Sequence, residues 1–219
     1  MTLQITRRAA RYDPDPRARA GFDCHHWIRL PALLDPQLLR DAQAGVDAGC
    51  FAQTHHTAVA SASIDLRMEP NATSEMLVLL CNDPAVLAAI RDITGRRAVT
   101  RFNGSVYRML PATGHQQEWH DDLVQGRLVA LTVNLGTSSD AGSCEGGVLE
   151  IRERGTGRVI AVVRNTRPGD AVLFRLDRQL EHRVTALSSG TKTAFAGWFR
   201  AGILLRDELR AARPRVERI

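Results

Sequence analysis

Residues 114–136 read GHQQEWHDDLVQGRLVALTVNLG and place His120 and Asp122 two positions apart, directly before a β-branched, apolar run. Side chains alternate across a β-strand, so residues two apart point to the same side. A histidine nitrogen and a carboxylate oxygen therefore aim into one space, while Asp121 between them points away. This stretch predicts part of a metal site at the end of a strand.

The sequence around this stretch changes character after residue 98. Short β-branched segments follow one another, separated by Gly, Ser, Asn and Asp. This spacing is typical of an all-β sandwich or barrel. The predicted strands are 99–110, 127–135, 147–152, 158–163, 170–176, 181–187 and 192–200.

The preceding part of the chain is predicted to be helical. Asp35-Pro36 is a good start for a helix over 35–49, and Asp83-Pro84 opens the second of two helices within 73–95. Residues 1–30 are expected to form an irregular lead-in, and 55–73 a long loop with one short strand. A short amphipathic helix is expected in 204–219. We expect one domain over 1–219, made of a helical part (1–98), a β-core (99–200) and a tail (201–219).

The composition of the 219 residues, with 44% hydrophobic and 24% charged, is that of an ordinary globular protein. No apolar stretch approaches the roughly 20 residues that span a bilayer, and the first residues lack the apolar region of a signal peptide, so we expect a cytoplasmic protein. The four cysteines form no CxxC pair, which argues for reduced thiols. The charge of +5 is spread over dispersed arginines, which argues against nucleic acid as a partner.

A third metal ligand should come from another strand, and His182 in LEHRV is the best candidate. Two imidazoles and one carboxylate on one face of a metal leave three adjacent positions open, as in non-heme Fe(II) oxygenases. The same ligands could bind zinc in a hydrolase. A His-x-Asp pair on its own is also compatible with a purely structural role.

Lys192 is the one lysine among 29 basic residues, and it lies ten positions after His182. Lysine carries a compact point charge, whereas arginine carries a wide planar fork. Strand reversal would bring its ammonium back toward the metal ligand, where a dicarboxylic co-substrate could pair with it. A carboxylate partner would offset the desolvation of a buried ammonium.

Together these motifs resemble the Fe(II)/2-oxoglutarate-dependent oxygenases, particularly their prolyl-hydroxylase-like branch. The resemblance covers roughly 99–200 through NGSVYRM, WHDD, VALTVNLG, EGGVLEI, RPGDAVLF, LEHRVTAL and GTKTAFAGWF in this order. It implies a mainly β, α+β fold: a double-stranded β-helix (jelly-roll or cupin-like) core with N-terminal helices packed on one sheet. It also implies that His120, Asp122 and His182 bind Fe(II), that Lys192 pairs with the distal carboxylate of 2-oxoglutarate, and that O2 is the other co-substrate. The basic residue is arginine in much of the branch, so Lys192 is a mild departure.

The resemblance assigns further residues to the co-substrate pocket. Tyr107 matches a tyrosine that lines it, although thirteen positions separate Tyr107 from His120 here. Thr132 and Asn134 match inward positions on a core strand, Leu149 an apolar wall residue, and Trp198 a large residue on the last core strand. Because Asp122 fills the carboxylate position that related halogenases replace with a small residue, hydroxylation is favoured over halogenation.

The expected reaction is hydroxylation of an unactivated C–H bond in a small molecule, amino acid or peptide, with release of succinate and CO2. Arg67, Gln117 and Trp119 are candidate substrate contacts, and segments 53–72 and 137–146 are candidate recognition loops. The alternatives are a prolyl- or aspartyl-type protein hydroxylase, a zinc-dependent hydrolase, and a non-catalytic jelly-roll binding module.

Overall fold

The computed structural model describes residues 2–56, 63–111, 113–124, 126–136 and 144–202. Residues 137–143 of one candidate recognition loop, residues 57–62 of the other and the helix expected in 204–219 lie outside these residues. Among the described helices, none has both the length and the apolar character required to cross a membrane.

The three predicted helices are confirmed, with the ends that their capping residues indicate. They are α2 (Pro36–Asp47), α3 (Ala72–Cys81) and α4 (Pro84–Thr94). The side chain of Asp35 accepts from the backbone N–H of Leu38, which satisfies a free donor at the start of α2. Asn71 and Ser74 form a capping box on α3. Gly95 ends α4 in the left-handed conformation, with φ 63°, which glycine adopts without steric cost.

The expectation of an irregular lead-in over residues 1–30 is wrong. This segment forms a hairpin, a helix and a strand: β1 (Thr2–Ile5), β2 (Ala10–Asp13), α1 (Pro16–His25) and β3 (Trp27–Leu30). Asp15 caps α1 and Pro16 occupies its first turn, a signal that the dense charges of the segment obscured. Strand β3 has too few residues to show a period and is fixed by its pairing with β12.

The region 55–73 also holds more strand than expected. β4 (Phe51–His56) and β5 (Ser63–Met68) pair with each other, and β5 pairs with β6 at Leu66↔Arg108 and Arg67↔Tyr107. Their polar sequences have no clear apolar alternation, so the pairing with the edge of the core sheet, rather than local pattern, defines them.

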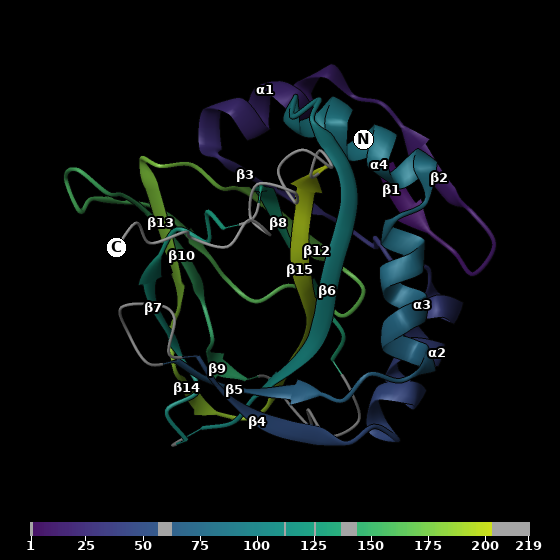
Figure 1. Ribbon diagram of the computed structural model, residues 1–219, viewed down its shortest axis with the longest axis vertical. Coiled ribbons are helices and arrows are strands. Elements are labelled where there is room, and N and C mark those ends of the chain that lie inside the picture. Colours follow the sequence, from purple (N-terminus) through teal and green to yellow (C-terminus); the bar gives the residue numbers. More distant parts are fainter. Residues whose placement is uncertain (1, 57–62, 112, 125, 137–143, 203–219) are drawn as a thin grey trace, which may run out of the picture.

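Two antiparallel sheets face each other and form the double-stranded β-helix (Figure 1). The larger sheet has the order β3-β12-β8-β15-β6-β5-β4, and the smaller has the order β11-β10-β13-β7. The strands not yet given are β6 (Val99–Met109), β7 (Gln117–His120), β8 (Arg127–Asn134), β9 (Glu145–Gly146), β10 (Leu149–Glu153), β11 (Val159–Val163), β12 (Ala171–Arg175), β13 (Leu180–Val184), β14 (Leu187–Ser189) and β15 (Lys192–Ala201). Short strands β9 and β14 pair separately.

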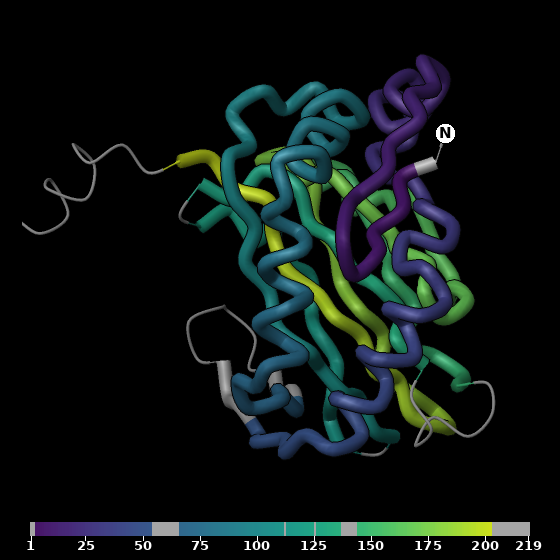
Figure 2. The backbone as a smooth tube through the Cα atoms, turned by 90° about the vertical axis from the view of Figure 1, so that its right-hand side faces the viewer, coloured from purple at the N-terminus to yellow at the C-terminus, as the bar shows by residue number. Residues whose placement is uncertain are grey.

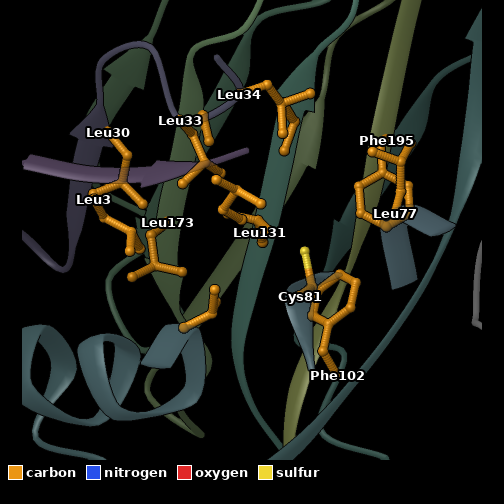
Figure 3. Packing of buried hydrophobic residues seen from close by; sticks show 14 of the residues in the cluster. Leu3, Leu30, Leu33, Leu34, Leu77, Cys81, Phe102, Leu131, Leu173 and Phe195 are labelled. Carbon is orange, nitrogen blue, oxygen red and sulfur yellow. The ribbon is translucent and has the colours of Figure 1, made fainter. Parts of the chain in front are cut away.

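The larger sheet separates two apolar clusters. The outer cluster fills the space between this sheet and the helices, which cover that face in Figure 2, and Figure 3 shows its packing around Leu131, Leu173 and Phe195. The inner cluster lies between the sheets and includes Ile151 and Phe174. Alternation along each strand sends neighbouring side chains to the two clusters, so the face of the larger sheet toward the smaller one carries the candidate site.

Candidate metal centre and co-substrate cavity

Pairing of β7 with β13 brings the two predicted histidine ligands together. His120 lies directly opposite His182 in this pair, so both side chains are on one face. Asp122 follows the end of β7 with φ 56°, a left-handed conformation that few residues other than glycine adopt. This turn directs the Asp122 carboxylate back toward the two rings.

The ligand atoms of His120, Asp122 and His182 all lie within 4.8 Å of one another. The Nε2 atom of His120 is 3.7 Å from Oδ1 of Asp122, and the Nε2 atom of His182 is 3.5 Å from Oδ2. The Nδ1 atom of His120 lies 2.6 Å from the carbonyl oxygen of Glu118. When Nδ1–H donates to this carbonyl, the lone pair of His120 is on Nε2 and faces the other ligands.

Each oxygen of Asp122 has a second partner behind it. The indole Nε1–H of Trp198 donates to Oδ2 at 2.7 Å, and the Arg127 guanidinium donates to Oδ1 at 3.1 Å. Burial opposes ionisation of Asp122, but the contacts with His182, His120 and Trp198 outweigh it and hold the pKa of this carboxyl well below its usual value. Asp122 is therefore an anionic ligand at neutral pH.

His182 is buried, with 5% of its surface exposed, and its ring packs 4.8 Å from Phe174 and 4.2 Å from His120 between centroids. Burial is the main cause that lowers the pKa of His182. A hydrogen bond that its ring donates to Asp122 opposes this effect, and electrostatic interaction with His120 adds to it. A neutral imidazole is the form that binds a metal.

The donor set fits a divalent iron ion. Two imidazole nitrogens and one ionised carboxylate oxygen converge from one side, and this 2-His-1-carboxylate facial set leaves the remaining coordination positions open. Outer donors that orient the carboxylate are a regular feature of such centres.

A cavity between the sheets contains four of the predicted co-substrate residues. Thr132, Asn134, Leu149 and Lys192 all line it, together with Ala194 and residues of the 163–166 turn. Lys192 donates to the carbonyl of Gly147, and a Cβ on Gly147 would approach its side chain to 3.0 Å. Burial lowers the pKa of Lys192 to about 8, against an opposing effect of Cys144. Within the described parts of the chain, no carboxylate pairs with this ammonium.

Comparison with known proteins agrees with this geometry. Residues 104–200 match the model of the 2OG-Fe(II) oxygenase superfamily, where 2OG is 2-oxoglutarate. The match covers the core strands, and with them the three metal ligands and Lys192. The matched sequence and the donor set are those of an Fe(II)- and 2-oxoglutarate-dependent oxygenase, with His120, Asp122 and His182 as the iron ligands. No curated protein matches the sequence.

Solved structures share the fold of this oxygenase at low sequence identity. An oxidoreductase of the 2OG-Fe(II) oxygenase family from Burkholderia pseudomallei has 15% identity and a TM-score of 0.63, over 91% of this chain and 96% of that one. A Pseudomonas putida prolyl-4-hydroxylase has 17% identity and a TM-score of 0.58, over 88% and 97%. A Trichoplax adhaerens prolyl hydroxylase in complex with a hypoxia inducible factor peptide fragment has 14% identity and a TM-score of 0.64, over 91% and 93%.

Two of the predicted co-substrate residues lie outside the lining of the cavity. Tyr107 is the cross-strand partner of Ala194, so it is on the same face of the sheet, one strand farther from Asn134. Trp198 instead contacts the iron ligand Asp122. The resemblance assigned Trp198 to the co-substrate pocket as a large residue on the last core strand, and the structure places its indole beside Asp122.

The predicted substrate residues are divided between two faces. Arg67 packs over the Tyr107 ring at 5.1 Å from its centroid, on the site face of β5. A register shift in β7 places Gln117 opposite Val184, whose side chain packs in the inner cluster, so Gln117 shares the site face. Trp119 precedes His120 in β7 and stacks between Arg152 and Arg183, at 4.3 and 4.6 Å. It is not brought to the iron ligands.

Arg127 is the contact that sequence reasoning missed. Its guanidinium bonds Asp122 and lies 3.5 Å from the centroid of the Trp198 ring. It is the first residue of β8, five positions after Asp122, and could have been noted as a cation near the metal ligand. The dispersed arginines of the chain concealed it.

Proposed function

We propose that this oxygenase hydroxylates an unactivated C–H bond of a small molecule, amino acid or peptide. Substrate, O2 and 2-oxoglutarate would give the alcohol, succinate and CO2. The observation that carries the proposal is that one face of one sheet holds both Trp198, against the iron ligand Asp122, and Lys192, in a cavity. We also propose one domain over the described N-terminal and core residues, because they share the outer apolar cluster.

Bound Fe(II) supplies the redox chemistry that activates O2 and breaks the C–H bond. The residues of the chain hold and orient what surrounds it. Lys192 would pair with the distal carboxylate of 2-oxoglutarate, because its ammonium is buried without an acidic partner among the described residues. Pairing with an anion offsets the desolvation of the ammonium.

The other cavity residues would position the co-substrate and exclude water. The Asn134 amide donates to the carbonyl of Thr166, which orients its oxygen. Thr132 adds a hydroxyl and Leu149 an apolar wall. At the opposite end of the site, Trp198 and Arg127 keep the Asp122 carboxylate ionised and directed at the metal. Positioning of the substrate then decides which C–H bond reacts.

The test requires no substrate. Anaerobic protein is mixed with Fe(II) and then with 2-oxoglutarate, and the visible charge-transfer band between iron and the keto acid is recorded. The band should form in the parent, vanish in His182→Ala, and require far more 2-oxoglutarate in Lys192→Ala. Tight zinc binding with no band would instead support a hydrolase. If the protein forms no charge-transfer band and binds no metal, the result would support a non-catalytic binding module.

The class of substrate divides the proposal into two forms. The Trichoplax adhaerens structure holds a peptide fragment, so a peptidyl side chain is the second candidate for this chain. Formation of succinate with free amino acids, compared with short peptides that contain the same residues, separates the two.

A further inference from the structure

Three arginines stand side by side on adjacent strands of the larger sheet. Arg200 on β15 is the cross-strand partner of Arg101 on β6 and of Arg127 on β8. Directly paired residues on neighbouring strands share a face. The three therefore form one row across the sheet, which we call the arginine row.

Contacts place the arginine row on the site face, beside the iron ligands. The Arg127 guanidinium stacks on Trp198 and bonds Asp122. The Arg200 guanidinium lies 3.3 Å from Oδ1 of Asn103, which is the cross-strand partner of Trp198. Lys192 is at the other end of β15, eight residues from Arg200, or roughly 26 Å along an extended strand. The row is thus separate from the cation that we assign to 2-oxoglutarate.

The row gathers three guanidinium groups at one end of the larger sheet, and Asp122 pairs with one of them. Burial lowers the pKa of Arg200, and the charges of Arg101 and Arg127 lower it further. Of these two neighbours, Arg127 pairs with the carboxylate of Asp122, which is itself a metal ligand, and Arg101 has no ion pair within the described ranges. The Nε atoms of Arg101 and Arg127 are buried and lack a hydrogen-bond partner.

Such an arrangement is costly unless it has a ligand. A buried donor without an acceptor has lost its hydrogen bonds to water without replacement, and adjacent like charges repel. An oxyanion would remove both penalties, because guanidinium groups donate parallel hydrogen bonds to carboxylate and phosphate oxygens. The donors that lack partners lie on the row, and Arg127 of the row contacts the metal ligand Asp122.

We propose that the arginine row binds an anionic group of the substrate, a carboxylate or a phosphate, and thereby places a neighbouring C–H bond at the metal. This proposal rests on the proposed oxygenase function and narrows its substrates to anionic ones. The two cationic ends of the sheet then bind different anions: Lys192 binds 2-oxoglutarate, and the arginine row binds the substrate.

The first experiment measures anion binding to the anaerobic protein loaded with Fe(II) and 2-oxoglutarate. Sulfate and acetate, as tetrahedral and planar probes, replace chloride at constant ionic strength in calorimetric titrations. The parent should bind at least one probe, and the double variant Arg101→Gln, Arg200→Gln should bind it at least about tenfold more weakly. Arg127 is left intact because it contacts the ligand Asp122.

Arg97→Gln is the matched control, since it removes the same charge from an exposed position four residues before Arg101. It should bind the probes like the parent. The charge-transfer band of the double variant must equal that of the parent, which shows an intact site. Equal probe binding in parent and double variant, or no binding in the parent, would overturn the arginine-row proposal. Absence of the band in the parent would overturn the oxygenase function instead.

The second experiment uses turnover to identify the anion. Succinate formation is compared within matched pairs: amino acids and their amides, and phosphate esters and the corresponding alcohols. The anionic members of one set should support turnover, and Arg101→Gln should raise their KM about tenfold or more with kcat little changed. Turnover of the neutral members at the same rate would contradict the inference.

Discussion

The two faces of the larger sheet use the same strands for opposite purposes. On β15, Phe195 and Phe199 point to the helices and are almost completely buried, with 1% and 0% exposed. Lys192, Trp198 and Arg200 are on the other face and contact polar partners or line the cavity. The period of two along a strand thus places residues that stabilise the fold beside residues that serve the site.

The comparison indicates where the free energy of folding comes from. The helix face forms a continuous apolar cluster with aromatic contacts, such as the Phe102 and Phe199 rings at 4.8 Å. The site face instead carries a desolvated ammonium, a left-handed aspartate and adjacent guanidinium groups, each of which costs free energy. Substitutions on the two faces should therefore separate stability from binding.

The largest expected effect is the loss of a metal ligand. His182→Ala should abolish both the Fe(II)/2-oxoglutarate band and succinate formation, because one imidazole and one carboxylate do not complete the facial set. Metal analysis and the anaerobic spectrum measure this change. His115→Ala is a control, since that buried histidine accepts from the backbone of Leu110 and is not an iron ligand. An unchanged spectrum in His182→Ala would contradict the assignment.

A cavity on the helix face should affect stability alone. Phe199→Ala removes a fully buried ring and should lower the free energy of unfolding by about 3–5 kcal/mol. Leu79→Ala, at an exposed position on α3, should change it by less than about 0.5 kcal/mol. Denaturant titration measures both. If Phe199→Ala also weakens 2-oxoglutarate binding tenfold in the folded protein, the two faces are not independent.

Replacing Lys192 should show the opposite pattern. Lys192→Met keeps the length of the side chain and removes its charge, so the Kd for 2-oxoglutarate should rise at least about 30-fold, as for a lost buried ion-pair partner. The protein without 2-oxoglutarate should not lose stability, because desolvation of the ammonium is relieved. Titration of the charge-transfer band and thermal unfolding test the two parts. A large loss of stability would contradict the separation of the faces.

Sequence pattern was sufficient where the signal is local. The Asp-Pro pairs at the starts of α2 and α4 and the strand cadence after residue 98 predicted the structure found, and the proximity of His120 to Asp122 is confirmed, although a left-handed turn at Asp122 produces it. Lys192 was identified because it is the one lysine, and it lines the same cavity as Thr132 and Asn134.

The sequence pattern was insufficient where pairing between strands that are distant in the sequence determines the structure. Strands β3, β4 and β5 exist because they extend the edges of the larger sheet. The arginine row depends on the register of three strands separated by many residues, and the bulge in β7 reverses the alternation at Gln117. Such registers follow from tertiary contacts and leave no period in the sequence.

A smaller effect is expected behind the ligand Asp122. Trp198→Phe keeps an aromatic surface for Arg127 but removes the indole donor to Oδ2, so Fe(II) affinity should fall about 10- to 100-fold. Trp27→Phe is the control, because Trp27 packs against the same inner cluster. Metal titration monitored by the anaerobic band measures the change. Equal Fe(II) affinity in both variants would show that the indole donor does not position the carboxylate.

The pH dependence of Lys192 provides the smallest test and connects the two faces. Burial lowers the pKa of Lys192 from 10.5 to about 8, so the unfolded chain holds more protons than the folded protein between these values. The penalty of burying the ammonium is therefore complete below pH 8. As pH rises from 8 to 10.5 the penalty is relieved, and the free energy of unfolding should increase.

Binding of 2-oxoglutarate should become weaker over the same rise in pH. Above pH 8 the amine must take up a proton to pair with the carboxylate, so the Kd should rise by up to about tenfold per pH unit. The parent profile is compared with that of Lys192→Met, in which both slopes attributed to the lysine should disappear. Identical pH profiles of the Kd in the two proteins would mean that the Lys192 ammonium does not bind the carboxylate of 2-oxoglutarate.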